Sequence, residues 1–194
     1  SWFQGNTLFP AFSGGPTSYI AADYQSTGTI GTISTWLLTP AITMKNGDVL
    51  TFYSRIPDGT EFPDRLEVRL SANGTSSNVG TTATSVGDFS NLLLTINPNL
   101  VTNVYPKVWT QFTVTVSGLA APGTGRIAFR YFTTDAGSNA PNGNQIGLDD
   151  VVYTVTGSGA TGIWTGPAGT IFTDAAATTP YDGTTPANSV YVKP

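Results

Sequence analysis

Alternation of apolar and polar residues is the feature of this sequence that restricts its fold most. In the run DRLEVRLSANG, Leu66, Val68 and Leu70 alternate with charged residues. Successive side chains of a β-strand point to opposite faces. The run therefore predicts a strand with one apolar face and one charged face. Glu67 lies on the charged face and is expected to point into water. No segment shows convincing helical periodicity.

The same period of two recurs in four further runs, GDVLTFYSRIP, WTQFTVTVSGL, GRIAFRYFTT and LDDVVYTVTG. Turn-forming residues separate the runs: Asn46-Gly47-Asp48, Pro57-Asp58-Gly59, Asn73-Gly74, Pro122-Gly123 and Asn142-Gly143. Many antiparallel strands that each bury one face pack most simply as two facing sheets. The sequence therefore predicts an all-β, two-sheet antiparallel β-sandwich.

Charge and residue usage exclude several functions. The chain has 8 Lys and Arg against 12 Asp and Glu, and its basic residues are scattered from Lys45 to Lys193. Because no basic patch is available to neutralise phosphates, we expect no nucleic-acid partner. No apolar run is long enough to span a bilayer, so we expect no membrane insertion. Cys and His are absent, which removes disulfides, thiolate chemistry and the commonest general base.

Catalytic residues are hard to find in this composition. Glycoside hydrolysis needs two acids beside a sugar-binding cleft, and the nearest candidates are Asp58, Glu61 and Asp64 in PDGTEFPDR. All three fall in an expected turn, where we expect them to be solvated. Without His, a Ser-His-Asp triad is also excluded. We therefore expect that the protein is not an enzyme.

Two adjacent acids, Asp149 and Asp150, open the last predicted strand. On a regular strand Asp149 shares a face with Val151 and Tyr153, which is the expected core side, and Asp150 points to the other face. A carboxylate at the rim of an apolar face is costly unless it is paired or bound to a metal ion. The pair therefore predicts a positive counterpart.

The residues alone leave three counterparts for these acids open. A structural calcium ion could be held by both acids and Asp23, with further oxygens from the Asn- and Asp-rich loop at 135–145, since calcium prefers oxygen ligands. Alternatively, Arg126 or Arg130 on the preceding strand could form a salt bridge with them. The third possibility is plain exposure to solvent.

Aromatic residues are the other candidates for a binding role. Five of them could stack on sugar rings: Tyr105, Trp109, Phe62, Trp36 and Tyr24. Most aromatics of a β-sandwich lie in the core, and we expect this of Trp36 and Trp109. Tyr105 stands beside a proline in an expected loop. It is the best candidate for an exposed ligand-binding residue.

A domain boundary is expected near residue 157. The small-residue segment TGSGATG (156–162) is typical of a hinge, and the composition then changes to Ala, Thr and Pro. Residues 1–157 would form the sandwich and residues 158–194 an extended C-terminal tail. The tail is either a linker into a following module or an extra strand on the sandwich, through Ile171-Phe172 or Val190-Tyr191-Val192.

Seven segments, in order, together resemble the cleaved-adhesin, or choice-of-anchor J, domain. They are SWFQGN, FPAFSGGPTSYIAADYQST, GTISTWLLTP, FPDRLEVRLSANGTSSNVGTTATSVGDFSNLLLTINP, YPKVWTQFTVTVSGL, GRIAFRYFTTDAG and IGLDDVVY. The resemblance runs from Ser1 to about Thr156, so it covers most of the chain. It implies a jelly-roll β-sandwich of the galactose-binding or MAM-like kind.

The resemblance also implies a function. Such domains belong to large secreted bacterial surface proteins, often of the Bacteroidetes, and act as noncatalytic adhesion units. Related domains bind structural calcium near the first and last strands, and the terminal LDD motif of this site falls on Asp149 and Asp150. The expected partner is a host or matrix glycan or protein. The alternative is a carbohydrate-binding module of an exported enzyme.

The sequence departs from the family at its start. In the family a strand with a Phe-Asp or Glu-Asn-Phe-Asp element precedes WFQGN, and this strand is missing here. A sandwich without it exposes a sheet edge, and exposed edges recruit partners. We therefore hypothesise that the tail or a neighbouring copy donates a strand. Such donation would make the protein a structural subunit of a surface filament.

Overall fold

The computed structural model describes residues 1–59, 61–156, 171–174, 176, 178–182, 184 and 191–192. The chain divides into two units, Ser1–Thr154 and Val155–Pro194. Residues 157–162 of the expected hinge lie outside the described residues. The first unit contains the strands of the sandwich.

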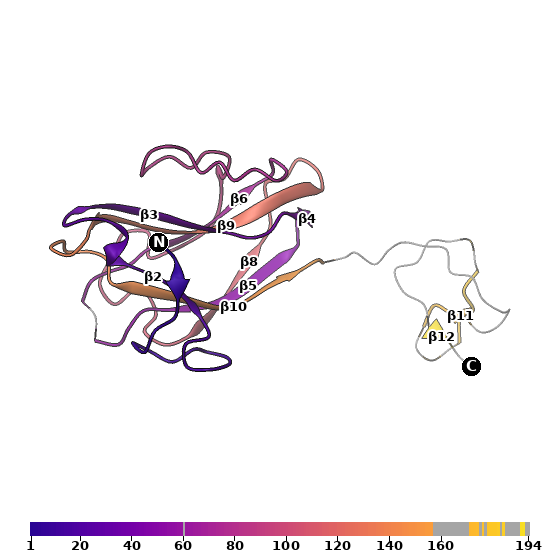
Figure 1. Cartoon of the computed structure of the whole chain (residues 1–194). Helices are drawn as coiled ribbons and strands as arrows, with labels where there is room; N and C mark the ends of the chain where they lie inside the picture. The colour runs from indigo at the N-terminus through magenta and orange to yellow at the C-terminus, as the bar shows by residue number, and fades with distance from the viewer. Residues whose placement is uncertain are drawn as a thin grey trace. The chain divides into compact units, whose positions relative to one another are not determined.

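Two antiparallel sheets form this unit, and they face each other in Figure 1. Sheet A has the order β1 (Phe3–Gln4), β2 (Ile20–Asp23), β10 (Gln145–Thr154), β5 (Val49–Arg55) and β8 (Thr110–Thr115). Sheet B has the order β3 (Gly31–Leu38), β9 (Gly123–Ala136), β6 (Leu66–Ser71) and β7 (Asn91–Ile96), and β4 (Ile42–Met44) pairs with the start of β9. A single 3-10 turn, η1 (Tyr24–Ser26), follows β2.

The strand order is that of a jelly roll. The innermost pair is β6–β7, and β5–β8, β3–β9 and β2–β10 enclose it in turn, so the chain is folded back on itself as a set of nested antiparallel pairs. Each pair lies in the sheet opposite to the pair that it encloses. This arrangement closes the two sheets over one core. The predicted fold class is confirmed.

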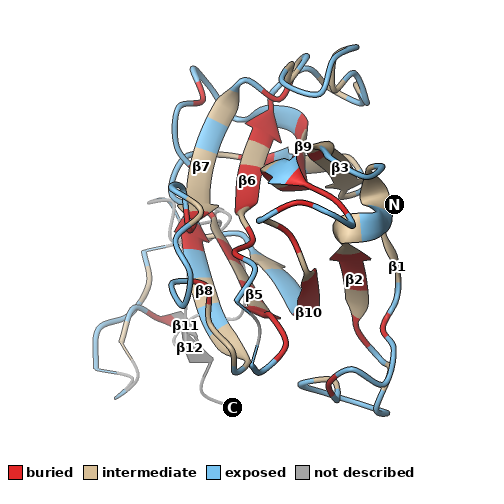
Figure 2. Cartoon of the chain, turned by 90° about the vertical axis from the view of Figure 1, so that its left-hand side faces the viewer, coloured by how far each residue is buried: buried red, intermediate tan, exposed pale blue. Residues whose placement is uncertain are grey.

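The core lies between the sheets and follows the predicted alternation. Leu66, Val68 and Leu70 of β6 are buried, as are Leu50 and Phe52 of β5. Figure 2 shows buried residues on the strands of both sheets. Burial of one such side chain contributes roughly 1.5–3 kcal/mol. The apolar faces read from the sequence therefore form part of the main core, which Ile33, Met44 and Ile96 complete together with other residues.

Each sheet also carries a cover on its outer face, which the alternation did not predict. The segment between β1 and β2 lies over sheet A, where Phe9, Tyr19 and Ala21 form a second, smaller cluster. Trp109, expected in the main core, packs in this cluster instead, with its ring 5.6 Å from that of Phe9. Its Nε1–H donates to Pro10 O at 2.8 Å. The N-terminal segment is thus fixed onto the sheet.

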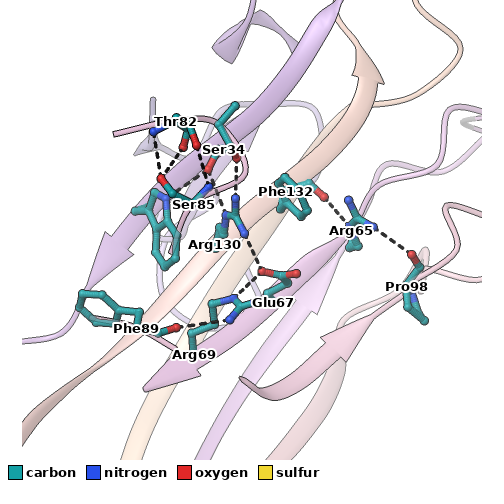
Figure 3. A network of polar contacts seen from close by, with 12 residues as sticks. Ser34, Arg65, Glu67, Arg69, Thr82, Ser85, Phe89, Pro98, Arg130 and Phe132 are labelled. Atoms are coloured by element: carbon teal, nitrogen blue, oxygen red, sulfur yellow. Dashed lines mark hydrogen bonds and ion pairs between the residues drawn. The ribbon is translucent and has the colours of Figure 1, made fainter. Parts of the chain in front are cut away.

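The outer face of sheet B carries a buried ionic network, drawn in Figure 3. Arg130 is only 1% exposed, and its guanidinium bonds Glu67 at 3.1 Å and Ala83 O, on the loop between β6 and β7, at 2.6 Å. The same guanidinium lies over the rings of Trp36 and Phe132. The prediction that Glu67 faces water is therefore wrong, because this loop covers it.

The described residues of the second unit include two short strands. Ile171–Phe172 (β11) pairs with Tyr191–Val192 (β12) in an antiparallel sheet of its own. These are the segments that were expected to add a strand to the sandwich if the tail folded back. Strand donation by a neighbouring copy stays a prediction, and the edge of sheet A beside β2 carries β1. The described residues include no helix with the length and apolarity needed to cross a membrane.

Candidate functional site

The twin acids lie at a β-bulge. Asp149 pairs with Tyr53 and Val152 pairs with Thr51, so three steps along β10 match two steps along β5. Asp150 lies within this bulge and has a φ of 45°. The bulge reverses the alternation of faces, and Asp149 shares the outer face of sheet A with Tyr53. The prediction that Asp149 lies on the core side is therefore wrong.

Backbone N–H groups satisfy the Asp149 carboxylate. Its Oδ2 accepts from Phe12 N at 2.8 Å and Ser13 N at 3.2 Å, and its Oδ1 accepts from Asp150 N at 2.8 Å. Neither expected arginine is the partner, because Arg130 bonds Glu67 and Arg126 bonds two backbone carbonyls. The counterpart is instead the N-terminal segment that covers the sheet.

The expected calcium ligands do not come together. Asp23 caps η1 by accepting from Gln25 N at 3.1 Å, and it pairs with Gln145, roughly 13 Å along β10 from Asp149. Asp150 is exposed. No group of three or more acidic, His or Cys side chains in the described ranges is placed to share a metal ion. As placed, Asp149, Asp150 and Asp23 do not fit one calcium site.

Tyr105 is not exposed, contrary to the prediction. It is 1% exposed, and its hydroxyl lies 2.6 Å from Ser54 Oγ inside the sandwich. Burial raises the pKa of this phenol well above its usual range. The proline beside it indicated a loop, but the side chain points into the core from that loop. It cannot contact a ligand at the surface.

Asp64 is the acid whose predicted exposure differs most from the structure. It was expected in solvent, yet it is fully buried. Its Oδ1 accepts from the Tyr131 hydroxyl at 2.5 Å and from Asn144 N at 2.8 Å, and its Oδ2 has no hydrogen-bond partner among the described residues. Burial raises its pKa to about 6, although both hydrogen bonds oppose the rise. Asp64 therefore acts as a support beneath Asn144 rather than as a group open to substrate.

Asn144 belongs to a pocket at the end of the sandwich that lies on the left in Figure 1. This pocket, here called the central pocket because other hollows adjoin it on two sides, has a volume of about 240 Å³. It is lined by Tyr24, Phe62, Gly137, Ser138, Ala140, Gly143 and Asn144. Three loops meet there, after β2, after β5 and between β9 and β10. Phe62 is 47% exposed and Tyr24 is half-buried, so two aromatic side chains border the opening.

The backbone around the central pocket is closely fitted. Gly137 has a φ of 126°, and a Cβ there would stand 2.3 Å from Gly28 O. Asn139 N–H donates to Thr29 O at 3.0 Å, which ties the β9–β10 loop to the loop after η1. Gly143 N–H donates to Pro63 O at 2.9 Å and ties it to the third loop. The pocket is therefore built before a ligand arrives.

The chemistry of the pocket is polar but uncharged. Its lining has two aromatic rings, the hydroxyl of Ser138 and the amide of Asn144, and none of its lining residues is a carboxylate or a cation. Tyr24 and Phe62 were both named from the sequence as possible sugar-stacking residues. The pocket itself was missed, because its loops are far apart in the sequence and only the fold brings them together.

Comparison with protein-family models and with curated proteins gives no match. Three solved structures similar to this chain represent three kinds of protein. The K3 cleaved adhesin domain of Lys-gingipain from Porphyromonas gingivalis w83 is 21% identical, with a TM-score of 0.48 over 80% of this chain and 91% of that one. A structure of carbohydrate-binding modules from the β-sandwich superfamily is 18% identical, with a TM-score of 0.49 over 80% of this chain and 54% of that one.

The third is a glycoside hydrolase family 43 arabinoxylan arabinofuranohydrolase from Bacillus subtilis. It is 16% identical, with a TM-score of 0.41 over 79% of this chain and 24% of that one. At these identities the likeness concerns the fold. Cleaved adhesin domains are thus among the solved structures similar to this chain.

Proposed function

We propose that the sandwich unit is a noncatalytic binding module that holds a neutral glycan in the central pocket. The observation that carries this proposal is the pair of accessible rings, Tyr24 and Phe62, that border an uncharged pocket. A sugar ring presents an apolar face of C–H groups and a rim of hydroxyls. Aromatic side chains match the face, and a few fixed polar groups match the rim.

The polar groups of the pocket suit this ligand. Ser138 offers a hydroxyl that can donate and accept, and Asn144 offers an amide that can do both. The backbone of Asn144 is already fixed by the Asp64 carboxylate, so little conformational freedom is lost when a ligand binds. The pocket has no cation among its lining residues to select a phosphate, sulfate or carboxylate group. A neutral polyhydroxylated ligand is the class that fits.

The acids near the pocket support binding rather than hydrolysis. Asp64 is fully buried, while Asp58 and Glu61 are exposed and Asp58 forms an ion pair with Arg55 at 3.2 Å. A glycosidase needs one protonated and one ionised carboxyl on opposite sides of the scissile bond. These three acids do not provide that pair at the pocket, so the bound glycan would leave unchanged.

We place this module on an extracellular adhesin of a bacterial surface, with a host or matrix glycan as partner. A carbohydrate-binding module of an exported enzyme would use the same pocket for a polysaccharide. A glycan array that contains host glycans and plant and microbial polysaccharides separates the two proposals by which group binds.

Site-directed variants test the pocket itself. Phe62→Ala is expected to weaken binding of the best array ligand about tenfold or more, which corresponds to roughly 1.4 kcal/mol, as measured by titration calorimetry. Phe12→Ala is the matched control, because Phe12 is 44% exposed but lies on the outer face of sheet A, stacked on Tyr53. Equal affinity of the Phe62 variant and the native protein, or no neutral glycan bound on the array, would contradict the proposal.

A further inference from the structure

Among the described residues, the central pocket shares lining residues with two further hollows. A second hollow, here the Thr27 hollow, has a volume of about 350 Å³ and shares Tyr24 and Ser138 with the central pocket. A third, the Glu61 hollow, has a volume of about 430 Å³ and shares Phe62 and Asn144 with it. The three hollows therefore adjoin in a row, with the central pocket in the middle.

The shared walls include the two aromatic side chains already described. Tyr24 stands between the Thr27 hollow and the central pocket, and Phe62 stands between the central pocket and the Glu61 hollow. Ligand pockets usually measure roughly 300–1,000 Å³. The central pocket lies just below that range and the two other hollows lie at its lower end, so each suits a small unit. An aromatic ring between neighbouring hollows can contact the units on both sides.

Both ends of the row are accessible. Gln25 and Thr29 line the Thr27 hollow, Leu8 and Glu61 line the Glu61 hollow, and all four residues are exposed. Leu8 is 54% exposed, which leaves an apolar surface at the far end. Since neither end is blocked by a buried wall, a linear ligand can continue past both hollows.

We propose that the three hollows are one groove with three subsites, which binds an internal stretch of at least three units of a neutral, linear oligosaccharide. This inference rests on the proposed function and adds to it the length and the mode of binding. The repeated order of hollow, ring, hollow, ring and hollow is the observation behind it. A module for a single terminal sugar would need only the central pocket.

The groove also selects against acidic chains. The Glu61 hollow is lined by the exposed carboxylates of Asp58 and Glu61, and none of its lining residues is a Lys or Arg. Arg55 lies under Asp58 and neutralises part of its charge, but Glu61 remains on the groove. A uronic acid in this subsite would meet a like charge. The third unit of the ligand is therefore not acidic.

Oligosaccharide ladders test the length. We would titrate the full chain with β-1,4-linked ladders of glucose, xylose and N-acetylglucosamine, each from one to five units, and with a galacturonic acid ladder as the acidic control. For at least one neutral ladder, affinity should rise at least about tenfold from one unit to three and change little from three to five. The acidic ladder should bind at least about tenfold more weakly than the neutral ladder of the same length.

Variants at the two ends locate the outer subsites. Leu8→Ala and Gln25→Ala should each lower affinity for three units while leaving affinity for one unit unchanged. Val108→Ala is the matched control, because Val108 is 66% exposed and lines none of the three hollows. Both end residues are exposed, so we expect all three variants to fold, which their circular dichroism would verify.

The outcomes separate this inference from the proposed function. Binding of a neutral glycan with the same affinity for one unit as for three overturns the groove and leaves the binding module standing. The groove is also overturned if the galacturonic acid ladder binds best, or if neither end variant changes the dependence on length. Binding of no glycan on the array and of no ladder overturns both.

Discussion

At the scale of single residues, the main surprise is how the acids are satisfied. Asp149 is held by three backbone N–H groups and Glu67 by two guanidiniums. Asp64 is buried, and one of its oxygens has no hydrogen-bond partner in the part of the chain that the structure describes. These solutions have different costs. Hydrogen bonds to a charged group contribute roughly 1.5–3 kcal/mol, whereas a buried carboxylate with an unmatched oxygen is destabilising.

Asp64 predicts a pH dependence of stability. Its pKa rises from 3.8 to about 6 on folding, so between these values the folded state binds more protons than the unfolded state, and stability falls as pH increases. A shift of about two units corresponds to about 3 kcal/mol. Asp64→Asn lacks this titration. The free energy of unfolding of Asp64→Asn relative to the native protein should therefore increase by up to about 3 kcal/mol from pH 4 to pH 7.

Urea unfolding of both proteins at several pH values measures this difference, and the shared contributions of other groups cancel. Loss of hydrogen-bond quality in the Asn side chain would add a constant offset, which does not depend on pH. A difference in unfolding free energy that stays flat from pH 4 to pH 7 would show that Asp64 is not buried as a carboxylate.

At the scale of elements, the loops that cover the outer faces decide which polar residues are buried. The loop between β6 and β7 lies over sheet B and places Arg130 between Glu67 and Ala83 O. Breaking one partner of a buried ion pair leaves the other uncompensated and typically costs roughly 3–5 kcal/mol. Removing Arg130 and Glu67 together should cost less than the sum of the two single changes, because neither member of this pair then stays behind without the other, although Arg69 loses its bond to Glu67.

A double-mutant cycle tests this network. Arg130→Met should destabilise the protein by at most roughly 3–5 kcal/mol, because Arg69 still pairs with Glu67. Arg130→Met with Glu67→Gln should cost clearly less than the two single changes added together. Limited proteolysis should cut the β6–β7 loop faster in Arg130→Met, because the bond to Ala83 O is lost. Lys107→Met, at a residue outside this network, is the control. Strict additivity in urea unfolding would argue against a coupled buried pair.

At the scale of the whole molecule, the jelly roll brings distant segments together. The outermost pair, β2–β10, joins residues near the two ends of the sandwich unit, and the pocket at its end is made by three loops from different thirds of that unit. The same closure brings Phe12 and Ser13 to Asp149. The last strand is thus held by backbone donors, at the position where the sequence suggested calcium.

Calcium dependence is the corresponding prediction for the whole protein. Three N–H groups directed at Asp149 disfavour a cation there, so we expect the thermal midpoint to change by less than about 1 °C when EGTA or calcium is added. Differential scanning calorimetry at low protein concentration measures this. A rise of several degrees with calcium would support the metal-binding role suggested by the family resemblance, and Asp149→Asn would then show whether this residue takes part.

The sequence by itself determined the five strands β5, β6, β8, β9 and β10 and the two-sheet architecture, since each depends on local alternation. It also determined the inward faces of Leu50, Phe52, Leu66, Val68 and Leu70. Only the tertiary structure decided the surroundings of Asp149, Glu67, Asp64 and Tyr105. A bulge of one residue reversed the face of Asp149, and loops covered faces that alternation assigned to water. Burial of a polar side chain depends on which distant segment lies over it. The alternation of residues around that side chain does not specify this segment.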